Sequence, residues 1–190
     1  MTRMGVLLSV VLWAACTRIS DLSSERYRVG VLFSLPDAPV VVLPMYADRK
    51  HQDDAKIAES VFYRSLTEMR PRMRQVSPSE SRARVQEASL LPVLERLGKS
   101  VPFSEDEMAD FHKLFGTPFF LQTALDEAAT VEGATHVRIR GRLWDLEKGD
   151  ILWEGTGESR GYLFLFFPTT PASLEKAAEV ASRGLIRKLP

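Results

Sequence analysis

The sequence contains few of the residues that build disulfide frameworks or metal sites, with one cysteine and three histidines in 190 residues. A single thiol forms no intramolecular disulfide, and it excludes zinc sites that need several thiolates. Net charge is also missing, because 25 Lys and Arg residues balance 25 Asp and Glu residues. Without the long-range positive field of nucleic-acid binders, we expect no nucleic-acid partner. We expect no cofactor and no metal, and the 45% hydrophobic content suits one globular domain.

Long hydrophobic runs are scarce, and the first of them lies at the N-terminus. Gly5–Trp13 carry no charge, follow Arg3 and precede Ala14 and Ala15. This order of a positive start, a short apolar run and small residues is typical of an export signal. The run has about half of the ~20 residues that a membrane-spanning helix needs. We therefore predict that residues 1–15 are a signal peptide.

Cys16, the single cysteine, directly follows the predicted signal. The stretch Leu12–Cys16 resembles the bacterial lipobox, with Trp13 where that motif usually has Leu. The resemblance implies that Cys16 becomes the first mature residue and carries acyl chains such as palmitate. Each buried CH₂ contributes about 0.8 kcal/mol, so several chains hold a protein on a membrane. The alternative is an ordinary secretory signal that is cut after Ala15 and leaves a free thiol.

Residues 16–25 are expected to be the lipid-bearing cysteine and a short polar tether, and 26–190 a single domain. The tether would reach about 30 Å when fully extended, so the domain would lie close to its membrane. Thr17 is a residue other than Asp next to the anchor. By resemblance to enterobacterial sorting, this favours the periplasmic face of the outer membrane.

The first half of the domain mixes strand and helix patterns. Tyr27–Leu35 and the β-branched run Val40–Tyr46 predict strands, the second of them buried on both faces. Apolar residues at helical spacing predict a helix from Asp53 to Pro71. A short strand over 73–76 should follow. Two further helices are predicted over 79–98, which Pro92 kinks or divides, and from the capping box at Ser104 to Gly116.

The second half changes to strand periodicity. Strands are predicted over 119–125, 135–146 and 151–160, followed by a helix over 173–189. A three-residue loop over 147–149, with Gly149 in the left-handed conformation, sets the register of the last two strands. That register pairs Trp144 with Leu152, Leu143 with Trp153, Arg142 with Glu154 and Arg138 with Glu158. The predicted class is α+β, sandwich-like: a mixed sheet of about 4–6 strands with a C-terminal antiparallel meander, flanked by about four helices.

Two segments carry a family resemblance: Val42-Leu43-Pro44 before a capped helix, and residues 140–157, which read RGRLWDLEKGDILWEGTG. With the order of elements, they resemble the small domain of periplasmic lipoproteins related to LpoB, CsgG and the N-terminal domain of TolB. The resemblance implies work in the cell envelope through protein contacts, without chemistry of its own. This chain departs from it in having a much shorter tether than LpoB-type activators and no paired amphipathic hairpins for a CsgG-type pore.

Candidate catalytic groups are sparse. Asp110 and His112 lie two residues apart on a predicted helix and so point to different sides, and no GxSxG motif supplies a nucleophile. A periplasmic hydrolase using His112 or His136 remains the less favoured alternative. Gly155, Gly157 and Gly161 are interpreted as easing the twist or a bulge of a strand. The alternating arginines over 138–142 are expected to be neutralised by Glu154 and Glu158.

The last notable feature is an apolar run before Pro168. It consists of Leu163, Phe164, Leu165, Phe166 and Phe167. The run is either a buried strand end or an exposed patch that contacts a partner protein or the membrane. The sequence as a whole favours a lipid-anchored, non-enzymatic envelope protein that acts as an assembly, auxiliary or regulatory subunit. A subunit of an oligomeric secretion complex is the alternative.

Overall fold

The computed structural model describes residues 17–26, 38–98, 102–163 and 170–190. Its strands are β1 (Thr17–Arg26), β2 (Val40–Val42), β3 (Tyr46–Ala47), β4 (Gln75–Val76), β5 (Phe119–Val131), β6 (Ala134–Asp145), β7 (Asp150–Leu163) and β8 (Thr170–Pro171). Its helices are the 3₁₀ turn η2 (Arg49–His51) and α2 (Gln52–Met69), α3 (Pro78–Glu87), α4 (Leu91–Gly98), α5 (Glu105–Phe115) and α6 (Leu174–Arg187). The expected strand Tyr27–Leu35 lies outside the described residues. No helix in the described ranges is long and apolar enough to cross a membrane.

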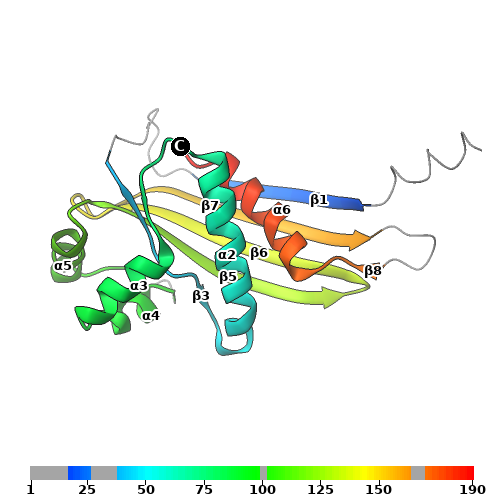
Figure 1. The fold of residues 1–190 in the computed structure, drawn as a ribbon, viewed down its shortest axis with the longest axis horizontal. Helices are drawn as coiled ribbons and strands as arrows, with labels where there is room; N and C mark the ends of the chain where they lie inside the picture. Colours follow the sequence, from blue (N-terminus) through cyan, green and yellow to red (C-terminus); the bar gives the residue numbers. More distant parts are fainter. Residues whose placement is uncertain (1–16, 27–37, 99–101, 164–169) are drawn as a thin grey trace, which may run out of the picture.

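The strands form one mixed sheet in the order β1-β7-β6-β5-β2-β4, and β3 and β8 pair with β5 and β7. The β1-β7-β6-β5 part is antiparallel, whereas β2, β3 and β4 add to it in parallel. Helices α2 and α6 lie across one face of the sheet, and α3, α4 and α5 gather at one end (Figure 1). The predicted α+β class, with its mixed sheet and antiparallel meander, is confirmed.

Strand β2 is buried on both faces, as its run of valines predicts. Val40 and Val42 belong to the core beneath α2 and α6. Val41 belongs to a second core, which α3, α4 and α5 close over Phe120 and Trp144. The two cores therefore share the sheet as a common wall.

The register of β6 and β7 corrects one predicted pair. Asp145 pairs with Asp150, so the loop has four residues instead of three, and Gly149 adopts the expected left-handed conformation with φ of 70°. Trp144 consequently faces Ile151 and not Leu152. The register then shifts by one residue, and the predicted pairs Leu143–Trp153, Arg142–Glu154 and Arg138–Glu158 are restored.

The glycines of β7 do not mark the bulge that the sequence suggested, because the register with β6 is regular from Gly155 to Gly161. None of them has a positive φ. A Cβ on Gly157 would lie 2.1 Å from the backbone oxygen of Ala181, and one on Gly161 would lie 2.9 Å from the Cβ of Ala172. Gly157 therefore allows α6 to approach the sheet closely, which is a packing role and not a bulge.

Helix ends agree with the local sequence signals. Ser104 and Glu107 form the predicted capping box of α5, which ends at Gly116 in the left-handed conformation. Pro92 occupies the second position of α4, so the predicted helix over 79–98 is divided in two, α3 and α4. The final helix begins after Ser173, whose side chain accepts a hydrogen bond from the backbone N–H of Lys176.

The segment expected to be a tether is strand β1 in this structure. Its ten residues pair with β7 from Thr17, opposite Leu163, to Arg26, opposite Glu154. Cys16 and residues 164–167 of the apolar run lie outside the described residues.

Candidate functional site

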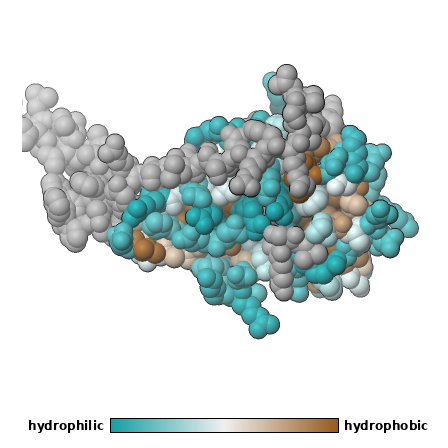
Figure 2. Space-filling model, turned by 180° about the vertical axis from the view of Figure 1, so that it is seen from behind, coloured by the Kyte–Doolittle hydropathy of each residue, from teal (hydrophilic) through white to brown (hydrophobic). Residues whose placement is uncertain are grey.

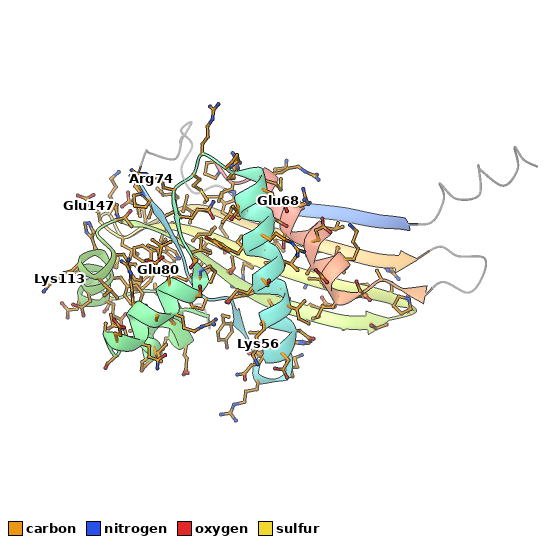
Figure 3. All side chains as sticks on the ribbon, in the orientation of Figure 1. Lys56, Glu68, Arg74, Glu80, Lys113 and Glu147 are labelled. Carbon is orange, nitrogen blue, oxygen red and sulfur yellow. The ribbon has the colours of Figure 1, made fainter. Side chains whose placement is uncertain are left out.

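A surface groove lies where β3, the start of α2 and α4 meet. Its volume is about 770 Å³. This is within the ~300–1,000 Å³ range of binding pockets. Lys56, labelled in Figure 3 on the first turns of α2, is one of the residues that line it. Residues 44–59, Arg82 on α3 and residues 91–95 contribute its lining, which the sequence patterns did not predict.

Glu59 ties the walls of the groove together. Its carboxylate accepts a hydrogen bond of 2.6 Å from the backbone N–H of Met45, just before β3. Both of its oxygens also accept hydrogen bonds from the guanidinium group of Arg82 on α3, at 3.2 and 3.0 Å. One carboxylate therefore joins α2, α3 and the β2–β3 connection, and fixes the groove before any ligand arrives.

A second polar contact fixes α3 against the sheet. The hydroxyl of Ser81, fully buried, donates to the backbone oxygen of Val42 at 2.8 Å. Together with the contacts of the half-buried Glu59, it holds α3 in place against the sheet. A buried polar group without such partners would cost free energy, so these contacts specify one arrangement.

The Tyr46 end of the groove is acidic. The Tyr46 hydroxyl donates to a carboxylate oxygen of Asp48 at 3.3 Å. The pKa of Tyr46 is raised by partial burial first, and then by the negative charges of Asp48 and Glu95 and the hydrogen bond to Asp48. The shift shows that both carboxylates act on this hydroxyl.

The three histidines do not come together. His51 lies in η2 with its Nδ1 3.4 Å from Asp54, His112 lies on α5, and His136 lies on β6. None of them lines the groove. Among the described residues, no group of three or more His, Cys, Asp and Glu side chains is arranged to hold a metal ion.

The back of the sheet carries the predicted ladder of charges. Arg138 binds Glu158 at 2.7 Å and Arg142 binds Glu154 at 2.8 Å, so both expected pairs are confirmed. Arg140 binds Asp126, which the sequence did not indicate because a register shift between Leu125 and Glu127 places it there. Figure 2 shows hydrophilic residues over much of this face. The arginines are therefore paired within the domain and do not form an open anion site.

No family model matches this chain, and no curated protein sequence matches it. Its fold is shared by the PelC dodecamer from Paraburkholderia phytofirmans, at 14% identity and a TM-score of 0.53, over 87% of this chain and 96% of that one. It is also shared by the lipoprotein GNA1162 from Neisseria meningitidis, at 17% identity and a TM-score of 0.50, over 65% of this chain and 83% of that one. The LpoB C-terminal domain from Escherichia coli overlaps less well, with 15% identity and a TM-score of 0.46 over 68% and 87%. At these identities the comparisons with PelC and GNA1162 show the fold alone.

Proposed function

We propose that this protein is a lipid-anchored, non-enzymatic envelope protein that acts as an assembly or regulatory subunit of an envelope complex. The observation that carries the proposal is the position of Cys16. This sole cysteine follows an export-signal pattern and directly precedes β1. A lipid on Cys16 would therefore join the sheet without a spacer.

The pairing of β1 with β7 supports a single membrane-facing end. Thr17 pairs with Leu163; Thr17 directly follows Cys16, and Leu163 is the first residue of the predicted apolar run. The lipid anchor and the apolar run over 163–167 are therefore both attached to the chain at the same end of the β1–β7 pair. We place both at the membrane surface, where apolar side chains add to the affinity of the acyl chains. The outer membrane, on its periplasmic side, is the favoured location.

The fold neighbours support the same class of work. One is described as a lipoprotein and another as a dodecamer. The domain itself uses its charged side chains mainly to hold its own elements together, as the Glu59 junction and the ladder over β6 and β7 illustrate. This use of charge suits a binding domain better than a hydrolase built on His112 or His136.

The anchor is tested by metabolic labelling with an alkyne analogue of palmitate and by fractionation of the envelope. Wild-type protein should be labelled and remain with membranes, whereas Cys16→Ala should be unlabelled. Trp13→Leu restores the usual lipobox residue and should keep or increase labelling. A mature protein that begins at Cys16 with a free, maleimide-reactive thiol would overturn the lipid assignment.

The partner is tested by in-cell crosslinking of tagged wild-type protein next to Cys16→Ala, with co-purifying proteins identified by mass spectrometry. A reproducible envelope protein that is lost with the anchor variant supports the proposal. An anchored protein without any partner would contradict the subunit role.

Self-assembly is a second candidate. The observation that favours it is the dodecameric neighbour, of which this chain covers 96%. Within the described ranges, β1 pairs only with β7, and residues 127–131 of β5 pair only with β6. The outer edges of these two strands, on opposite sides of the sheet, could therefore form backbone hydrogen bonds with another subunit. Head-to-tail contacts between unlike edges form a ring when the rotation between subunits closes, and an open filament when it does not. Native mass spectrometry of detergent-solubilised protein tests this: a closed oligomer supports it, and a monomer at all concentrations rejects it.

A further inference from the structure

The groove keeps two carboxylates that the rest of the described chain does not neutralise. Asp48 accepts only the Tyr46 hydroxyl, and neither Asp48 nor Glu95 forms an ion pair within the described residues. Glu59, by contrast, is paired with Arg82 in the same groove. Arg49, Lys56 and Arg82 also line the groove, so its charges balance overall, but Lys56 binds Asp53 and Arg82 binds Glu59. At the Tyr46 end a cation would find the carboxylates of Asp48 and Glu95 and an aromatic ring.

Apolar side chains lie next to these carboxylates. Leu91, Leu94 and Glu95 follow one another at helical spacing on α4, and all three line the groove. Leu91 is 38% exposed, a high value for a large hydrophobic side chain of this domain. The groove therefore offers an apolar wall beside an acidic end, which matches the aliphatic stem and charged head of a lysine or arginine.

The neighbouring strand favours an extended chain as the ligand. Among the described residues β3 pairs with β5 alone, through Tyr46 opposite Ala124 and Ala47 opposite Leu125. The groove runs along Pro44 to Arg49 and so follows this short strand. An extended segment of another protein could add to such an edge while its side chains enter the groove.

We propose that the groove binds an extended segment of a partner protein through a Lys or Arg side chain, whose stem packs on Leu91 and Leu94 and whose charged head meets Asp48 and Glu95. This inference deepens the proposed function, since it names the surface that would hold an envelope partner. Lipid labelling at Cys16 does not depend on the groove, so the failure of one proposal is distinguishable from the failure of the other.

The test uses full-length protein in detergent and a phage-displayed library of random heptapeptides. Enriched peptides should contain a Lys or Arg next to apolar residues. Synthetic copies of these peptides, measured by fluorescence anisotropy, should bind the Glu95→Arg variant at least tenfold more weakly than wild type. Replacing the basic residue of the peptide by Glu should restore binding to Glu95→Arg.

A matched control is Glu87→Arg, which makes the same charge change on an exposed residue of α3 outside the groove. Its peptide affinity should equal that of wild type, and thermal melts should show that both variants are folded. The proposal is rejected if no peptide is enriched, if the enriched peptides lack basic residues, or if Glu95→Arg binds them normally. Displacement of the peptides by equal concentrations of putrescine would assign the groove to a small cation instead.

Discussion

The close approach of α6 to β7 makes Gly157→Ala the most informative stability variant. The new methyl group would lie 2.1 Å from the backbone oxygen of Ala181 and 2.9 Å from the Cβ of Leu185. A backbone atom cannot rotate away, so α6 must move off the sheet and lose contacts along its length. Overpacking of a well-packed core costs about 1–3 kcal/mol. We place this variant at the upper end, about 3 kcal/mol, which corresponds to a fall in Tm of about 6–12 °C for a domain of this size.

Gly141→Ala is the matched control. Its Cβ would meet only side-chain atoms, at 3.0 Å from Trp153 and 3.2 Å from Leu185. These side chains can adjust, so a cost of about 1 kcal/mol is expected. Both variants lower the entropy of the unfolded chain equally, and this effect cancels in the comparison. Urea unfolding of the Cys16→Ala background, followed by circular dichroism, measures both. If Gly157→Ala costs no more than Gly141→Ala, then α6 does not pack on β7 as described.

Three other interactions, two at α6 and one beneath α5, are each open to a single substitution. Arg70→Ala removes the hydrogen bonds that its guanidinium donates to the backbone oxygens of Ile186, in the last turn of α6, and of Leu189, just beyond it. It should lower the unfolding free energy by about 1–2 kcal/mol in urea, whereas Arg72→Ala, on an exposed residue nearby, should not. Gln122→Leu leaves the buried indole N–H of Trp144 unpaired and should cost about 2–3 kcal/mol in the same assay, with an unchanged stability arguing against the contact. The hydrogen bond from Lys176, and then the charges of Lys176 and Arg183, lower the pKa of Glu179. The ionised carboxylate of Glu179 therefore stabilises the fold at neutral pH, and this contribution is lost as the pH falls through the lowered pKa. The difference in urea midpoint between wild type and Glu179→Gln should therefore be present at pH 7 and should shrink as the pH falls below 4.5, and a difference that does not change with pH would refute it.

Local signals account for most of the elements that could be predicted. The capping box at Ser104 and the left-handed Gly116 depend on residues within one turn of α5, so the sequence places this helix correctly. The valine run of β2 needs only its composition to predict burial on both faces. The charge pairs of β6 and β7 were predicted from a three-residue turn; the turn has four residues, and the pairs are still correct because the longer loop and the register shift compensate each other.

The features that were missed depend on packing between distant segments. Gly157 has an ordinary backbone conformation, so only the position of α6 above it reveals its role. The pair of Arg140 with Asp126 needs the irregular register of β5. The groove needs β3, α2 and α4 in place, and the signal in the sequence was limited to Pro44, which interrupts the strand before Tyr46. Such contacts depend on the tertiary fold and cannot be predicted from any single stretch of the sequence.

The pairing of β1 also determines how the domain would respond to mechanical force. With an anchor on Cys16, tension enters the sheet at Thr17, at one end of an antiparallel pair with β7. When force pulls on this end, the hydrogen bonds between β1 and β7 break one after another. Such peeling needs less force than breaking all of these hydrogen bonds at once by shear. Complete peeling would release ten residues, which span about 33 Å when extended. The released strand would then act as an extensible linker, and the distance between domain and membrane would increase under load while α2, α6 and the groove stay folded.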